Sequence, residues 1–133
     1  MRPKLALLVV GLTLVPVASA AVGLRATLRA PAADPVINVK WWYSIKATDL
    51  KGRPLKAKLT AEVIALGTSY PVDYGPSVPL RPITNWPFKG TFRDYIIFPP
   101  ESRGFTLTLR WTIRSKLDGE TYKKVLKRKV TPG

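Results

Sequence analysis

Apolar and polar residues alternate along most of this chain. In the segment 24–30, leucine and alanine alternate with arginine and threonine. The same period of two runs through the segments 39–47, 55–65 and 105–113. Successive side chains of an extended strand point to opposite faces of a sheet. Each of these segments is therefore predicted to be a β-strand with one face toward a core.

Turn signals separate the predicted strands. Asp49–Pro54 contains a glycine, which allows positive φ, and a proline that fixes the entry to the next strand. Asp118–Gly119 is a two-residue type I′ hairpin signal between the last two strands. This turn sets a register that places Trp111 opposite Leu126. Apolar side chains of one strand then face apolar side chains of the other, which supports the register.

The middle of the chain is harder to interpret. Residues 67–88 contain five prolines and no sustained period. We predict one short edge strand near Tyr70–Tyr74, followed by an ordered excursion stiffened by proline. A further strand is expected from Phe88 to Phe98. Ile64 and Leu66 interrupt the polar face of the preceding strand, which indicates that the far end of that strand is covered.

About seven short strands without a helical stretch predict an all-β protein, an antiparallel β-sandwich. The N-terminal segment 1–20 has two basic residues, an apolar run from Leu5 to Val15 and the small residues Ala18-Ser19-Ala20. This pattern is typical of a signal-peptide helix that is cleaved after export. Residues 21–133 would then form a single secreted, periplasmic or cell-surface domain. The competing interpretation is a retained membrane anchor over residues 5–24.

Two segments carry a resemblance to a known class of domain. The first is Ile45–Leu55, in which an alternating strand is followed by Thr-Asp-x-x-Gly-x-Pro and a second alternating strand. The second is the strand Gly104–Ser115 with its Asp-Gly hairpin. Together they resemble secreted bacterial immunoglobulin-like domains. The resemblance implies an immunoglobulin-like sandwich acting as an adhesion, spacer or interaction module, and it carries over no catalytic residue.

The composition excludes several classes of catalytic and metal site. The chain has no histidine and no cysteine. This excludes ordinary zinc and haem sites, a histidine-based triad, a cysteine nucleophile and disulfides. We therefore expect no metal, no cofactor and no enzymatic activity. The alternative is a small secreted hydrolase that uses acids assembled by the long middle loop. A glycosidase needs two carboxylates across a cleft, and Asp94 and Glu101, which flank Pro99-Pro100, are the candidate pair.

Positive charge is the strongest candidate signal, with 22 Lys and Arg against 8 Asp and Glu. The hairpin register places a basic cluster on the outward face of the last two strands. The third strand would add two lysines if it pairs beside them. The predicted binding residues are Arg110, Arg114, Lys123, Lys127, Lys129, Lys56 and Lys58.

Like charges facing each other across a sheet repel unless a counter-charge is present. The cluster is either a solvated face or a contact surface for a polyanion at the cell envelope. Acidic wall polymers, anionic lipid head groups and an acidic protein are the candidate partners. Nucleic acid is disfavoured because the chain is expected to be exported.

Aromatic residues form a second candidate. Trp41 and Trp111 fall on inward faces and are expected in the core. Trp42 points the other way, and Trp86 lies in the long middle loop. Exposed rings of this kind can stack on sugars or anchor a protein interface. The alternative is that the proline-rich excursion folds back over Trp42 and hides both rings.

Overall fold

The computed structural model describes residues 23–133. The predicted signal peptide, and the anchor alternative except for Gly23 and Leu24, lie outside the described residues. The domain boundary after residue 20 therefore stays a prediction. Among the described residues, no helix is long and apolar enough to span a membrane. The elements are β1 (Arg25–Arg29), β2 (Lys40–Thr48), β3 (Lys56–Ala65), β4 (Thr68–Pro71), β5 (Trp86–Lys89), β6 (Thr91–Ile97), the 3₁₀ turn η1 (Pro100–Ser102), β7 (Leu107–Leu117) and β8 (Glu120–Val130).

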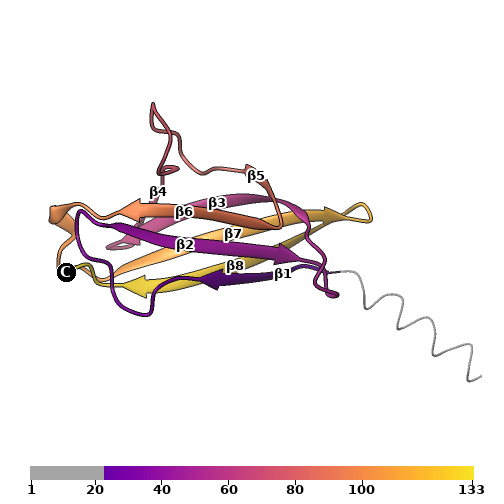
Figure 1. Ribbon diagram of the computed structural model, residues 1–133, viewed down its shortest axis with the longest axis horizontal. Helices are drawn as coiled ribbons and strands as arrows, with labels where there is room; N and C mark the ends of the chain where they lie inside the picture. The colour runs from indigo at the N-terminus through magenta and orange to yellow at the C-terminus, as the bar shows by residue number, and fades with distance from the viewer. Residues whose placement is uncertain (1–22) are drawn as a thin grey trace, which may run out of the picture.

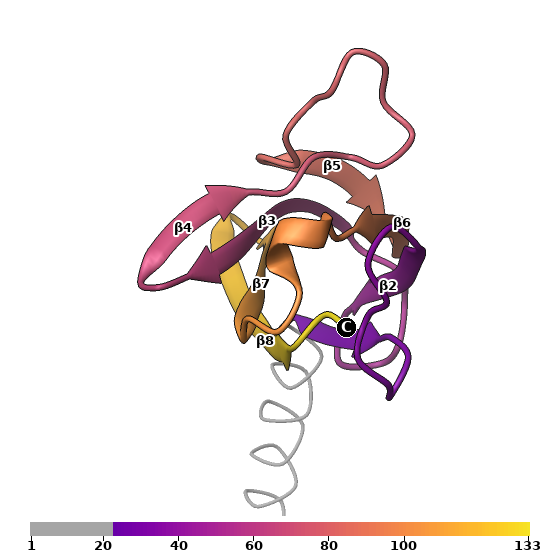
Figure 2. The ribbon, with the colours of Figure 1, turned by 90° about the vertical axis from the view of Figure 1, so that its left-hand side faces the viewer.

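The strands form two antiparallel sheets, which confirms the all-β prediction. One sheet has the order β1-β2-β6. The other has the order β4-β3-β7-β8, and β5 pairs with β3 as well. Figure 1 shows the strands running along the length of the described part of the molecule. The end-on view in Figure 2 shows the sheets enclosing a common interior in a sandwich-like arrangement.

The core lies between the inward faces that the alternation predicted. Tyr43 and Ile45 of β2 pack there with Leu59 of β3 and Trp111 and Ile113 of β7, and all five side chains are buried. The rings of Tyr43 and Trp111 lie 5.1 Å apart and join the two sheets at their centre. Burial of these large apolar side chains is the main stabilising contribution that a chain without disulfides can make.

The final hairpin has the predicted register. Trp111 lies opposite Leu126, and Leu107 lies opposite Val130. Asp118 and Gly119 both have positive φ, at 50° and 81°, as a type I′ turn requires. The prediction from the Asp-Gly signal is therefore confirmed for every pair in the hairpin.

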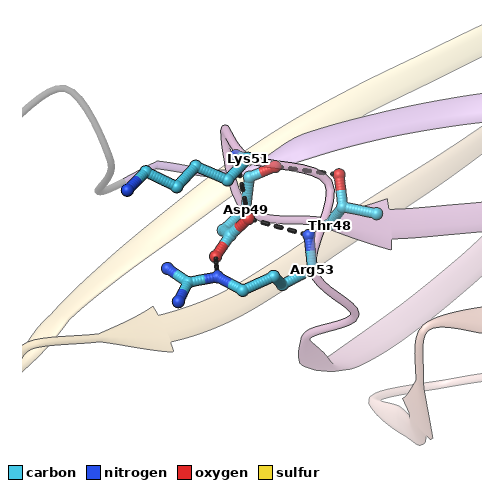
Figure 3. Close-up of polar contacts among 4 residues, drawn as sticks. All are labelled: Thr48, Asp49, Lys51 and Arg53. Carbon is cyan, nitrogen blue, oxygen red and sulfur yellow. Dashed lines mark hydrogen bonds and ion pairs between the residues drawn. The ribbon is translucent and has the colours of Figure 1, made fainter.

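Asp49 holds the turn between β2 and β3 (Figure 3). Its carboxylate accepts hydrogen bonds from the backbone N–H groups of Lys51 and Arg53, each at 2.9 Å, and the Arg53 side-chain Nε donates at 2.6 Å. The Thr48 hydroxyl donates to the Asp49 carbonyl oxygen at 2.9 Å. The hydrogen bond from the Arg53 backbone is the largest cause that lowers the pKa of Asp49 below its ordinary value.

The strand expected from Phe88 to Phe98 is two strands in different sheets, so that prediction was wrong. β5 pairs with β3, and β6 pairs with β2. The chain crosses between the sheets at Gly90, which has a φ of 74°. Its N–H donates to the Leu55 carbonyl, and its carbonyl accepts from the N–H of Ala47.

Backbone hydrogen bonds at its two ends hold the proline-rich excursion in place. The predicted edge strand near Tyr70–Tyr74 lies slightly earlier, as β4. The chain then leaves the sheet edge and returns so that Val72 and Ile83 hydrogen bond to each other and to the backbone of Ala61. Figure 2 shows the loop standing out from the sheet between β4 and β5.

Two apolar side chains lie outside the positions expected for them. Leu66, predicted to lie under a covering segment at the end of β3, is 92% exposed. It occupies the tight turn to β4 with a φ of 50°, which directs its side chain into solvent. Phe105 precedes β7 and is exposed as well, because the ladder with β8 begins only at Leu107.

Candidate functional site

The structure brings all seven predicted basic residues to the outer face of one sheet. Arg110 lies opposite Lys127, Arg114 opposite Lys123, and Thr108 opposite Lys129 in the β7–β8 ladder. β3 pairs with β7 on its other side and places Lys58 opposite Arg114. Lys56 lies two residues along β3 on the same face. The condition set for the two β3 lysines, that β3 pairs beside the hairpin, is therefore met.

Glu62 divides this basic face in two. It lies opposite Arg110 in the β3–β7 ladder, and its Oε1 atom is 3.0 Å from Nη2 of Arg110. Ser69 of β4 donates to the other carboxylate oxygen at 2.7 Å. This hydrogen bond, followed by the contact with Arg110, lowers the pKa of Glu62. The expected uncompensated repulsion between Arg110 and Lys127 is therefore wrong, because Arg110 has its own counter-charge.

On the other half of the face, no acidic side chain is paired with a cation in the β3–β7 or the β7–β8 ladder. Lys58, Arg114 and Lys123 form a row across three adjacent strands, and all three are exposed. Directly paired residues on neighbouring strands have Cβ atoms about 4.5–5.5 Å apart, so these cations repel one another. An anion is the complement that would relieve this repulsion.

A groove lies beside this row. Its volume is about 760 Å³. β5 forms one side with Pro87, Phe88 and Lys89, and Lys89 lies directly opposite Lys56. The groove is also lined by Lys58, Arg114 and Lys116. We call the cations Lys56, Lys58, Lys89, Arg114 and Lys116 the basic groove.

Lys89 and Lys116 are the two cations of the basic groove that the sequence reasoning did not include. Lys116 stands two positions after Arg114 in the same alternating strand, so the period of two was a sufficient signal. Lys89 had no such signal, because it reaches the groove only through the pairing of β5 with β3.

The two candidate tryptophans lie in different sheets and have different surroundings. Trp86 of β5 stacks on Tyr74 of the excursion with ring centroids 4.7 Å apart, so the excursion does cover it. Trp42 on β2 is 39% exposed and packs against Tyr95 of the neighbouring strand β6 at 4.9 Å. The guanidinium of Arg93 lies 4.2 Å from the centre of the Trp42 ring. The expectation that the excursion hides both rings is therefore wrong for Trp42.

The acidic residues that a hydrolase would use do not line a common cleft. An apolar cleft of about 410 Å³ opens between β4 and β6, and Asp73 is the carboxylate among its lining residues. Asp94 is buried inside β6, where it accepts a hydrogen bond from the N–H of Gly75 at 3.0 Å, and burial raises its pKa. Glu101 is exposed on η1. Within residues 23–133, no group of three or more acidic side chains is placed to hold a metal ion.

Comparisons with known proteins place few constraints on function. No protein-family model matches the chain, and no curated protein matches it. The chain is similar to the crystal structure of a DUF4466 family protein from Parabacteroides merdae, with a TM-score of 0.45 and 17% sequence identity. The match covers 85% of this chain and 44% of the other, so this chain spans less than half of the length of that protein.

Proposed function

We propose that this chain is an exported, non-enzymatic binding module of immunoglobulin-like architecture. In our proposal it contacts an anionic partner at a cell envelope through the outer face of β3, β7 and β8. Export is supported by the pattern of residues 1–20, in which a basic start, a short apolar run and a small-residue cleavage site follow one another.

The strand order supports the immunoglobulin-like architecture. In such sandwiches the strands A, B and E are neighbours in one sheet, and C, F and G are neighbours in the other. Here β1-β2-β6 and β3-β7-β8 have the same order along the chain. The Asp49 turn between β2 and β3 joins the two sheets at the position where strand B connects to strand C.

One observation carries the binding proposal. Lys58, Arg114 and Lys123 lie side by side on three paired strands, exposed and without an acid in their row. Such an arrangement costs stability through mutual repulsion. A bound polyanion would remove that cost, and a concentrated positive field also raises the rate of encounter with anionic partners.

The test compares two double variants that each lower the net charge by two. Arg114→Gln with Lys123→Gln removes cations from the proposed face. Arg25→Gln with Arg29→Gln removes exposed cations from β1 in the other sheet. Retention on immobilised poly-L-glutamate and on immobilised polyphosphate is measured along a salt gradient.

We expect the Arg114 and Lys123 variant to elute at clearly lower salt than the Arg25 and Arg29 variant, because retention depends on the face. Equal shifts for the two variants would mean that net charge alone causes retention. Failure of the unaltered protein to bind either polymer would contradict the proposal as well.

A further inference from the structure

We infer that the basic groove holds a single chain of a linear phosphodiester polymer. This inference rests on the proposed function and names the ligand class and the place where it binds. The groove is a local feature of one end of the sheet, whereas the proposed function requires only that the basic face be a contact surface.

The cations of the groove form two parallel rows. Lys89 and Lys56 face each other across β5 and β3, and Lys116, two residues beyond Arg114 on β7, extends that row along the groove. Lys58 and Arg114 form the second row across β3 and β7. Residues in neighbouring strands are about 4.8 Å apart, and residues two apart in one strand are separated by about 6.7 Å. The result is a lattice of positive charge long enough to contact several anionic groups of one chain.

The shape of the groove favours a chain over a membrane. Pro87 and Lys89 of β5 stand on the same side of the sheet as Lys58 and Lys56, which they face, so the cations lie along a concave surface that a flat bilayer cannot follow. A single polymer strand can enter the groove and reach all five cations. Pro87 and the lysine stems then contact the uncharged backbone between the anionic groups.

The residue types suit phosphate groups that are spaced along a chain. The basic groove contains four lysines and one arginine. The guanidinium of arginine pairs with carboxylate and phosphate alike through two parallel hydrogen bonds, whereas the lysine ammonium binds phosphate as a compact point charge with no fixed geometry. Point charges on a lattice also allow a repetitive polymer to bind in several registers.

The same sheet face supplies a matched control. Lys127 and Lys129 of β8 are exposed, as are Lys56 and Lys116. Lys127 lies opposite Arg110, six residues along β7 from Lys116. Six residues of an extended strand span about 20 Å. This exceeds the screening length of about 8 Å at physiological ionic strength, so these two lysines contribute little to the field in the groove.

The experiment measures binding of a synthetic glycerol-phosphodiester oligomer by calorimetry at physiological ionic strength. Lys56→Gln with Lys116→Gln is compared with Lys127→Gln with Lys129→Gln, and thermal melts confirm that both are folded. The first pair should weaken the Kd by roughly tenfold or more, which is about 1.4 kcal/mol or more, because both cations are in contact with the ligand. The control pair should weaken it by less than about threefold. If Lys56→Gln with Lys116→Gln fails to fold, Lys58→Gln with Lys89→Gln replaces it, with the same expectation.

Several outcomes would overturn the inference without removing the proposed function. These are equal losses for the two variants, tighter binding of poly-L-glutamate than of the oligomer, and binding only to vesicles that contain phosphatidylglycerol. In each of them the basic face still binds an anion, but the groove does not select a phosphodiester chain. Failure of the unaltered protein to bind any of the three probes would overturn the inference and the proposed function together.

Discussion

Glu62 is the residue that changes the electrostatics of the basic face most. Its carboxylate contacts Arg110 on one side and Ser69 on the other, so the Arg110 end of the face carries less net charge than the Arg114 end. Alternation along the segment 55–65 places Glu62 on the outward face of its strand. The contact with Arg110 depended on the register between β3 and β7, which no turn signal specifies.

Replacing Glu62 with glutamine tests this division of charge. The ion pair is partly exposed, so the free energy of unfolding should fall by at most about 1 kcal/mol. Arg110 would lose its counter-charge, and retention on polyphosphate should therefore extend to higher salt. Unchanged retention in the same salt gradient would mean that the Arg110 end does not take part in binding.

Trp111 shows how far a single residue can be predicted from the pattern. It occupies the inward face of an alternating strand, it is 1% exposed, and it packs on Tyr43 of the opposite sheet. Trp41 is buried in the same way. The environment of Trp42 could not be predicted, because its contacts with Tyr95 and Arg93 depend on the pairing of β2 with β6.

Trp111→Ala should lower the free energy of unfolding by about 3–5 kcal/mol, the usual loss for a buried large aromatic side chain. Denaturant melts measure this loss. Trp42→Ala is the control, and it should cost much less because part of that ring is already in water. A loss below about 1 kcal/mol for Trp111→Ala would contradict its place at the centre of the core.

At the scale of elements, the turn at Asp49 links the stability of the fold to pH. Hydrogen bonds from the Arg53 and Lys51 backbone favour the ionised carboxylate and lower its pKa in the folded protein. Because the pKa is lower in the folded protein, the ionised carboxylate stabilises the fold at pH values above the ordinary pKa of the group. This contribution is lost as the pH falls through the pKa of the folded protein. The free energy of unfolding should therefore fall in acid partly because this turn loses its ionised carboxylate.

Asp49→Asn removes that titration. The variant should be less stable than the unaltered protein near neutral pH, and the difference should shrink as the pH falls below about 4. Urea melts at a series of pH values measure the two curves. Parallel curves over this range would contradict the role assigned to the Asp49 carboxylate.

The excursion between β4 and β5 is fixed to the sandwich at Gly75. The N–H of Gly75 donates to the buried carboxylate of Asp94 at 3.0 Å. A Cβ atom at this position would lie 2.7 Å from the Tyr95 ring and 2.9 Å from Oδ1 of Asp94. Only a residue without a side chain allows the loop to approach β6 this closely.

Gly75→Ala should therefore destabilise the protein by roughly 1–3 kcal/mol, as overpacking of a tight contact does. The loss should be concentrated in the excursion, and hydrogen exchange should increase at Tyr74 and Ile83, whose N–H groups are bonded within it. Gly133→Ala is the control, since a Cβ atom there meets nothing within 4 Å. Wild-type protection of the excursion in Gly75→Ala would contradict this anchoring.

The split between β5 and β6 explains why one element was predicted wrongly. Phe88 and Phe92 pack on the core and Gly90 is buried between them, so the period of two continues in phase while the chain passes from one sheet to the other. The alternation of inward and outward residues does not indicate which of the two sheets a strand joins. The positive φ of Gly90 and its hydrogen bonds to Leu55 and Ala47 are the physical basis of the crossing.

At the scale of the whole molecule, local signals and long-range pairings differ in how well they can be predicted. The Asp-Gly turn alone predicted the register of the final hairpin and so the residues on its outward face. The structure has that register in every pair of β7 and β8. The groove needed two more pairings, of β3 with β7 and of β3 with β5. Each of these joins segments that are distant in sequence, so alternation alone could not indicate them.

The position of bound anion on the molecule tests the central claim most directly. The backbone amide signals of isotope-labelled protein are recorded by NMR while the glycerol-phosphodiester oligomer is added at physiological ionic strength. We predict that the largest shifts occur in the segments 56–58, 87–89, 114–116 and 121–123, with small shifts in β1 and β2. Shifts of similar size on both sheets, or shifts concentrated around Arg25 and Arg29, would contradict a binding site on the outer face of β3, β7 and β8.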